Sequence, residues 1–152
     1  MIMKLKERRR LSKNMDILID VNVILNYVTE RDDPFRESSK EIMKLCAEEE
    51  FNGYIAFHSL SIIWYALRKK TEQERRFWLK NICEILTVIG ATHDQVINAI
   101  DEIQFKDFED CLQDKCAQNA GVDYIVTCNI KDFDNADTKA LAPDEFITMI
   151  KH

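Results

Sequence analysis

Short runs of β-branched and aliphatic residues alternate with longer helix-like segments along this chain. Parallel strands need helical crossovers of this kind, because a tight hairpin joins only antiparallel strands. The alternation therefore predicts one α/β domain in which helices cover both faces of a central parallel sheet of about five strands. The expected strands are residues 16–20, 54–59, 85–90 and 123–129, with a short fifth strand around residues 139–143.

Local signals place the ends of the expected helices. A helix start is read from Ser, Thr, Asp or Asn as the cap, reinforced by Glu or Gln three residues later or by Pro in the first turn. Gly53 is expected to end the helix that begins after Asp33. The starts are at Asp33 with Pro34, Thr71 with Glu74, Thr92 with Gln95, and Asp107. The expected helices are residues 21–28, 35–50, 60–70, 71–82, 93–100, 107–120 and 144–152.

Composition excludes several other classes of protein. The chain has 152 residues, of which 46% are hydrophobic and 32% are charged, which suits a single globular domain. No segment is apolar over the length of a membrane span and none resembles a secretory signal, so we expect a cytoplasmic protein without membrane association. The five cysteines show no C-x-x-C spacing and the three histidines are scattered, which argues against a zinc site or a disulfide framework.

Charge is distributed unevenly between the first residues and the rest. Residues 1–14 hold six Lys or Arg and one Glu; since the whole chain carries −6, residues 15–152 carry −11. We expect residues 1–14 to be a disordered basic leader and residues 15–152 to form the domain, because MDILIDVN from Met15 looks like a natural domain start. An acidic domain suits a nucleic-acid enzyme if its carboxylates gather around a cation.

Asp20 poses a particular problem, because it stands between Ile19 and Val21 at the end of the first strand. A buried carboxylate costs several kcal/mol unless a cation or hydrogen-bond donors meet it. In parallel sheets, ligands bind beyond the carboxyl ends of the strands. Asn129 follows the fourth strand and Asp132 comes three residues later. We therefore expect these polar residues to lie at the same end of the sheet as Asp20.

Further acidic residues lie in the first turn of the helix before the fourth strand: Asp107, Glu109 and Asp110. Converging carboxylates with few His or Cys nearby are typical of a Mg²⁺ or Mn²⁺ site. Each residue also has a simpler reading: Asp107 and Asp110 suit helix capping, and Asp132 suits an ordinary turn. Their shared location favours the metal site over separate structural roles.

Three segments resemble the PIN domain, the fold of metal-dependent ribonucleases that includes the VapC-type toxins. They are ILIDVNVIL (17–25), KDFEDCLQDKCAQNAGVDYIVTCNIKDF (106–133) and LAPDEFI (141–147). The likeness is greatest to the stand-alone bacterial toxin components and covers residues 15–150. It implies a PIN-like α/β/α sandwich with acidic residues gathered in a pocket at one end.

The resemblance also assigns roles to individual residues. It implies that the metal is held by Asp20, Asp110 and Asp132, and that Glu109 orients or deprotonates the attacking water. The expected substrate-binding positions are Asn22, Thr127 and Asn129.

Two positions depart from the family pattern. Cys128 replaces the usual Arg of the T-R-N loop, and Ile62 stands where many members carry Glu or Asn, unless Glu41 or Glu109 substitutes. His58, Ser59 and Ser61 lie near that position and are read as capping or packing residues.

The function implied by the family is a metal-dependent endoribonuclease that hydrolyses RNA phosphodiester bonds as the toxin of a type II toxin–antitoxin pair. The implied partners are RNA, a cognate antitoxin protein and a second copy of the chain. Basic residues are candidates for guiding RNA, although an ordinary solvated helix end is the simpler reading; they are Arg68, Lys69, Lys70, Arg75 and Arg76. Aromatic residues are candidates for a partner surface or for the core; they are Trp64, Tyr65, Phe77 and Trp78.

Two alternatives compete with the nuclease reading. Ile62 supports a catalytically weakened PIN domain that acts as an RNA- or antitoxin-binding module. The other alternative is a HAD-like phosphatase with Asp20 as nucleophile. That family has a second Asp two residues later, where this chain has Asn22, so the phosphatase reading is disfavoured.

Overall fold

The computed structural model describes residues 14–151. The basic leader expected at residues 1–14 lies outside the described residues except for Asn14, so that boundary stays a prediction. Within residues 14–151, no helix combines the length and the apolar character that a membrane crossing requires.

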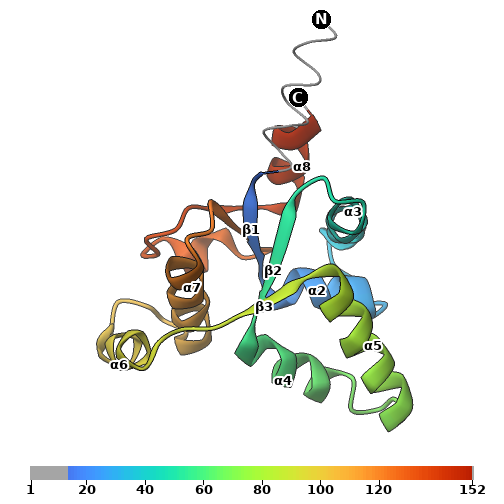
Figure 1. The fold of residues 1–152 in the computed structure, drawn as a ribbon, viewed down its shortest axis with the longest axis horizontal. Helices are drawn as coiled ribbons and strands as arrows, with labels where there is room; N and C mark the ends of the chain where they lie inside the picture. The colour runs from blue at the N-terminus through green and yellow to red at the C-terminus, as the bar shows by residue number, and fades with distance from the viewer. Residues whose placement is uncertain (1–13, 152) are drawn as a thin grey trace, which may run out of the picture.

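Five strands form one parallel sheet in the order β3-β2-β1-β4-β5 (Figure 1). The predicted α/β fold with a central parallel sheet is therefore confirmed. The chain builds the sheet from β1 outward, first to β2 and β3 on one side and later to β4 and β5 on the other. The order reverses at β1, which makes the carboxyl ends of β1 and β4 the expected ligand site. The strands are β1 (Asp16–Ile19), β2 (Asn52–Ala56), β3 (Thr87–Ile89), β4 (Tyr124–Val126) and β5 (Ala140–Leu141).

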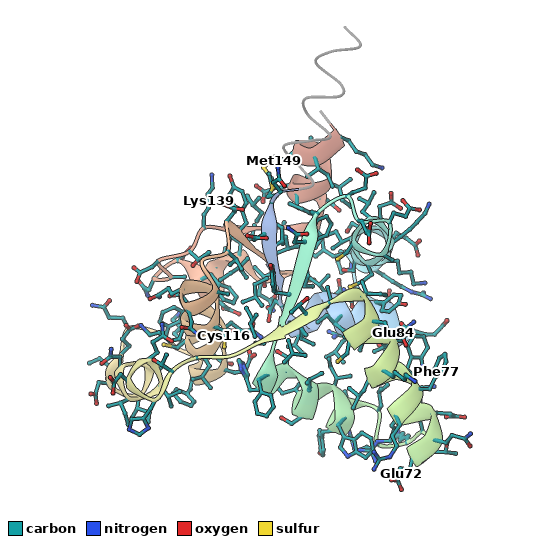
Figure 2. All side chains as sticks on the ribbon, in the orientation of Figure 1. Glu72, Phe77, Glu84, Cys116, Lys139 and Met149 are labelled. Atoms are coloured by element: carbon teal, nitrogen blue, oxygen red, sulfur yellow. The ribbon has the colours of Figure 1, made fainter. Side chains whose placement is uncertain are left out.

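Helices cover both faces of this sheet (Figure 1). Ile17 and Ile19 point to a core shared with α2, α3, α4, α5 and α8, whereas Leu18 points to a core shared with α7. Because β1 is buried on both faces, its sequence is a continuous apolar run instead of an alternating one. Cys116, on α7, packs in the second core (Figure 2). The helices are α2 (Val21–Val28), α3 (Arg36–Ala47), α4 (Phe57–Ala66), α5 (Glu72–Ile85), α6 (His93–Asp101), α7 (Phe108–Ala120), the 3₁₀ helix η1 (Ile130–Phe133) and α8 (Pro143–Lys151).

Most of the predicted helix starts are confirmed. Thr71 and Glu74 form a reciprocal capping box at α5, and Thr92 and Gln95 form another at α6. Asp107 caps α7, with its Oδ1 accepting from the Glu109 N–H at 2.8 Å. Each of these contacts joins residues at most three apart, so local sequence is sufficient to specify them.

Three local predictions were wrong. The second strand ends at Ala56, and the helix expected from residue 60 begins at Phe57. His58 and Ser59 therefore lie in α4, and their side chains form hydrogen bonds with α7. Asp33 does not cap α3. Its Oδ1 accepts from the Phe35 N–H at 2.8 Å, so it closes a turn before the helix begins at Arg36.

Gly53 lies in β2 and does not end α3, which stops at Ala47. A Cβ at Gly53 would lie 2.4 Å from Cys46 Sγ and 2.6 Å from Leu86 Cδ2, both closer than side-chain atoms can approach. The glycine therefore allows α3 and the segment before β3 to pack against β2.

Gly53→Ala should lower the free energy of unfolding by about 1–3 kcal/mol, because the added methyl overpacks a buried site. Denaturant unfolding monitored by circular dichroism would measure the loss. Gly90→Ala is the matched control, since a Cβ there meets no atom within 4 Å. Adding Cys46→Ala to Gly53→Ala removes one of the two clashes and should restore part of the loss. Equal stability of the two single glycine variants would contradict this account.

Candidate metal centre

Asp20 lies where β1 ends and α2 begins, and it is 1% exposed. Its Oδ1 accepts from the Val21 N–H at 2.8 Å, and its Oδ2 accepts from the Thr127 hydroxyl at 2.8 Å. Its own N–H donates to the Val126 carbonyl at 2.9 Å, which ties it to β4. Two hydrogen-bond donors therefore stabilise the Asp20 carboxylate, which stands between apolar residues in the sequence.

The first turn of α7 brings two more carboxylates to Asp20. Ligand oxygens of Asp20, Glu109 and Asp110 lie within 4.8 Å of one another. Asp110 is 7% exposed and Glu109 is half-buried. We call these three residues the acidic group. The acidic group lies at the switch point of the sheet, where the strand order reverses at β1, and at the N-terminus of α7. The N-terminus of a helix is its positive end and favours negative charge.

Burial and mutual repulsion distort the titration of this group. Burial, followed by the charge of Glu109, raises the pKa of Asp20 to about 7. Burial, followed by the charges of Asp20 and Glu109, raises the pKa of Asp110 to about 8. Near neutral pH, Asp20 and Asp110 therefore retain protons for much of the time. A hard divalent cation with oxygen ligands would take the place of those protons, so the donor set fits Mg²⁺ or Mn²⁺.

Glu109 behaves differently because polar residues from α4 and α7 surround it. Burial tends to raise the pKa of Glu109, but hydrogen bonds with His58 and Gln113 outweigh it and lower the pKa. His58 Nε2 lies 3.0 Å from Glu109 Oε1, and Gln113 Nε2 donates to the same oxygen at 2.9 Å. Burial lowers the pKa of His58, yet contacts with Cys116 and Glu109 raise it to about 9. Glu109 therefore faces a histidine that is protonated at neutral pH.

The sequence reasoning missed this network around Glu109. It assigned His58 and Ser59 to capping or packing, and it gave Gln113 no role. Ser59 Oγ accepts from Gln113 Nε2 at 2.7 Å, and both side chains are fully buried. The spacing of Glu109 and Gln113, four residues apart on one helix, was the available signal; nothing local connected them to α4.

The remaining predicted site residues lie at varied distances from the acidic group. Thr127 is buried against Asp20, and its Oγ1 also accepts from the Asn129 N–H at 3.0 Å. Asn22 is half-buried in the first turn of α2, and the Asn129 side chain is exposed. Asp132 is exposed on η1 and is outside the group of ligand oxygens that lie within 4.8 Å of each other among the described residues. Its place as a ligand remains a prediction.

The predicted basic and aromatic residues divide between exposed and packed positions. The Arg75 guanidinium lies 3.7 Å from the centre of the Trp64 ring, and Arg76 pairs with Glu72 at 2.8 Å on the surface. Tyr65 and Phe77 are 65% and 63% exposed, and Figure 2 shows Phe77 on the outer side of α5. Packing against the main core instead involves Trp78, whose ring meets Tyr27 edge-on.

Comparison with known proteins places this geometry in a family. The family model described as "PIN domain" matches residues 16–131. No curated protein sequence matches the chain significantly.

Several solved structures share the fold. VapBC2 from Rickettsia felis, bound to promoter DNA, is 18% identical over 84% of this chain and 98% of that chain, with a TM-score of 0.64. VapBC-1 from nontypeable Haemophilus influenzae is 12% identical over 86% and 99%, with a TM-score of 0.63. VapC20 from Mycobacterium tuberculosis, a toxin that cleaves the Sarcin-Ricin loop, is 16% identical over 72% and 86%, with a TM-score of 0.55.

At such identities these structures establish likeness of fold alone. The family match covers most of the chain and includes Asp20, the acidic pair on α7 and the start of the loop after β4, and it ends one residue before Asp132. The five-stranded parallel sheet agrees with it. The chain therefore belongs to the PIN domain family.

Proposed function

We propose that this protein is a metal-dependent endoribonuclease of the VapC toxin type, which hydrolyses RNA phosphodiester bonds and is controlled by a cognate antitoxin in the cytoplasm. The observation that carries the proposal is the acidic group, in which three carboxylates converge at the switch point of a parallel sheet. The RNA-loop cleavage described for the Mycobacterium tuberculosis toxin supports RNA as the substrate.

Asp20 and Asp110 are the proposed inner ligands for Mg²⁺ or Mn²⁺, with Asp132 joining them from η1. Asp132 lies outside the acidic group, on η1 beyond the carboxyl end of β4, and its proposed role rests on the resemblance to the family. When bound, the ion would activate a water molecule and neutralise charge that develops on the phosphodiester. The chain contributes a rigid Asp20, because the Thr127 hydroxyl and the Val21 N–H each hold one of its oxygens.

Glu109 is the proposed residue that orients or deprotonates the attacking water. Its lowered pKa keeps it ionised at neutral pH, as a group that accepts a proton must be. Asn22 and Asn129 are proposed to contact RNA. Thr127 is fully buried and donates to Asp20, so its proposed role is to position that carboxylate.

An antitoxin is the proposed protein partner, because the structures of similar fold include VapBC complexes from two organisms. The exposed Tyr65 and Phe77 are candidate contacts for it or for a second copy of this chain.

One observation favours a second candidate function: Ile62 packs against the main core and offers no ligand atom. A weakened domain that binds RNA or antitoxin without cleavage is therefore the alternative.

Cleavage of an end-labelled RNA by the purified protein tests the proposal. With Mn²⁺ or Mg²⁺ the wild-type protein should cleave, and EDTA should abolish cleavage. Asp110→Asn should lower the rate about 100-fold or more, because it removes a buried ligand charge. Asp101→Asn, at an exposed position on α6, is the matched control and should leave the rate unchanged. Metal binding without cleavage would favour the binding module instead.

A further inference from the structure

We infer that His58, Ser59 and Gln113 form a hydrogen-bonded clamp that holds Glu109 as the fourth acidic ligand of the metal centre, in compensation for Ile62. The inference rests on the proposed function and refines it: as a ligand of the ion, Glu109 would orient the attacking water and would not take its proton, because His58 and Gln113 bind its other oxygen. His58 and Gln113 act here through Glu109 and do not themselves contact the reacting phosphate.

Position 62 supplies no acidic group in this chain, and α4 supplies something else on the same side. Ile62 is half-buried and packs against the main core. Residues four apart on a helix share a face, so His58 lies one turn before Ile62 on that face of α4. His58 Nε2 then reaches across to Glu109 Oε1 on α7, at 3.0 Å. The face of α4 that carries Glu or Asn in many family members therefore carries a histidine here, and that histidine binds an acid from another helix.

Glu41, the other candidate substitute, lies elsewhere. Its carboxylate accepts from the Lys151 ammonium at 3.3 Å, which joins α3 to α8 on the surface. Glu109, in contrast, belongs to the acidic group with Asp20 and Asp110. Glu109 is therefore the substitute that the fold supports.

The clamp fixes Glu109 through one of its two oxygens. The His58 Nε2 and the Gln113 Nε2 both bind Oε1, at 3.0 and 2.9 Å. Oε2 lies outside these two bonds and is the oxygen proposed for a cation, which would replace the hydrogen bond between Glu109 and Asp110. Donors that orient a ligating carboxylate in this way commonly change metal affinity 10- to 100-fold when they are removed.

Gln113 shows that this orientation is specified and not incidental. Its side chain is fully buried, and its NH₂ group donates to both Glu109 and Ser59. Its Oε1 is buried and has no hydrogen-bond partner among the described residues. Turning the amide over would satisfy neither acceptor and would place an oxygen against the Glu109 carboxylate. The fold thus accepts one unpaired carbonyl in order to direct two donors at Glu109 and Ser59.

The test compares His58→Leu with His58→Gln, whose amide can still donate to Glu109. Calorimetric titration should show Mn²⁺ affinity about 10-fold weaker in His58→Leu and near wild type in His58→Gln. RNA cleavage should show the same pattern in kcat, with little change in KM. His93→Leu, at an exposed position on α6, is the matched control. Thermal unfolding in EDTA checks that every variant is folded.

A double-variant cycle separates the clamp from general disruption of the site. Because His58 is proposed to act through Glu109, His58→Leu should weaken Mn²⁺ binding no further in a Glu109→Gln background. Additive losses, or Mn²⁺ affinity unchanged in His58→Leu, would overturn the clamp while leaving the nuclease intact. Should His58→Leu not fold, unchanged Mn²⁺ affinity in Glu109→Gln overturns the inference equally. A wild-type protein that neither binds Mn²⁺ nor cleaves RNA would overturn the proposed function, and the clamp with it.

Discussion

Asp20→Asn is expected to lower the rate of RNA cleavage at least about 1,000-fold while making the metal-free protein more stable at neutral pH. Asp20 is 1% exposed and lies closest to the end of the central strand, so an amide there removes a buried ligand charge without changing the size of the side chain. The Thr127 hydroxyl and the Val21 N–H can still bond to the amide after the Thr127 hydroxyl rotates. The proposed loss is therefore chemical and not structural.

The two halves of this prediction need separate measurements. Cleavage of end-labelled RNA with Mn²⁺ measures the rate, and thermal unfolding in EDTA at pH 7.5 measures stability. The free energy of unfolding should rise because ionising the buried Asp20 carboxyl, whose pKa is raised to about 7, destabilises the wild-type fold. An amide at this position carries no charge to bury. Asp101→Asn should change neither quantity. Cleavage by Asp20→Asn at the wild-type rate would remove Asp20 from the proposed site.

The stability of the metal-free protein is expected to fall as pH rises from about 4 to about 8. Asp20 titrates near 3.8 when unfolded and at about 7 when folded, so in this range the folded chain holds a proton that the unfolded chain has lost. Stability that is fully present below pH 4 is then lost as pH rises, at about 1.4 kcal/mol per pH unit for each such group, or roughly 4 kcal/mol for Asp20 alone.

Neighbouring groups extend the same trend. Asp110, with its pKa raised to about 8, carries the loss to higher pH. His58 acts in the same direction: its pKa is raised from 6.5 to about 9, so the stability it contributes is present below pH 6.5 and lost towards pH 9. Glu109 opposes the trend, because its lowered pKa contributes stability that is lost only on acidification below its ordinary value of 4.5.

Thermal unfolding in EDTA at pH 5, 6, 7 and 8 measures this dependence. Saturating Mg²⁺ should stabilise the protein progressively more as pH rises, because the ion competes with the protons on Asp20 and Asp110. In Asp20→Asn the slope without metal should be shallower by the share that Asp20 contributes. Stability that rises between pH 5 and 8 in EDTA would show that these carboxylates are not buried together.

Short stretches of the sequence predict much of this architecture. The parallel sheet follows from β-branched runs separated by helical segments, and the capping boxes at Thr71 and Thr92 follow from contacts three residues long. Asp20 stands out in the sequence because Ile19 and Val21 flank it. The hydrogen bond that its carboxylate accepts from the Val21 N–H joins adjacent residues and is again local. The position of Asp110 in the first turn of the helix before the fourth strand indicated a metal site, the family resemblance assigned it as a ligand, and the structure places its carboxylate near that of Asp20.

Other features depend on residues that meet only after folding. His58 and Glu109 are 51 residues apart, and Ser59 and Gln113 are 54 apart, so no local pattern pairs them. The same long-range bonds to α7 accompany the early start of α4, where apolar and aromatic residues had favoured a strand. Short-range hydrogen bonds and side-chain periodicity are properties of a segment, whereas the polar surroundings of Glu109 arise from two helices that the sheet brings together.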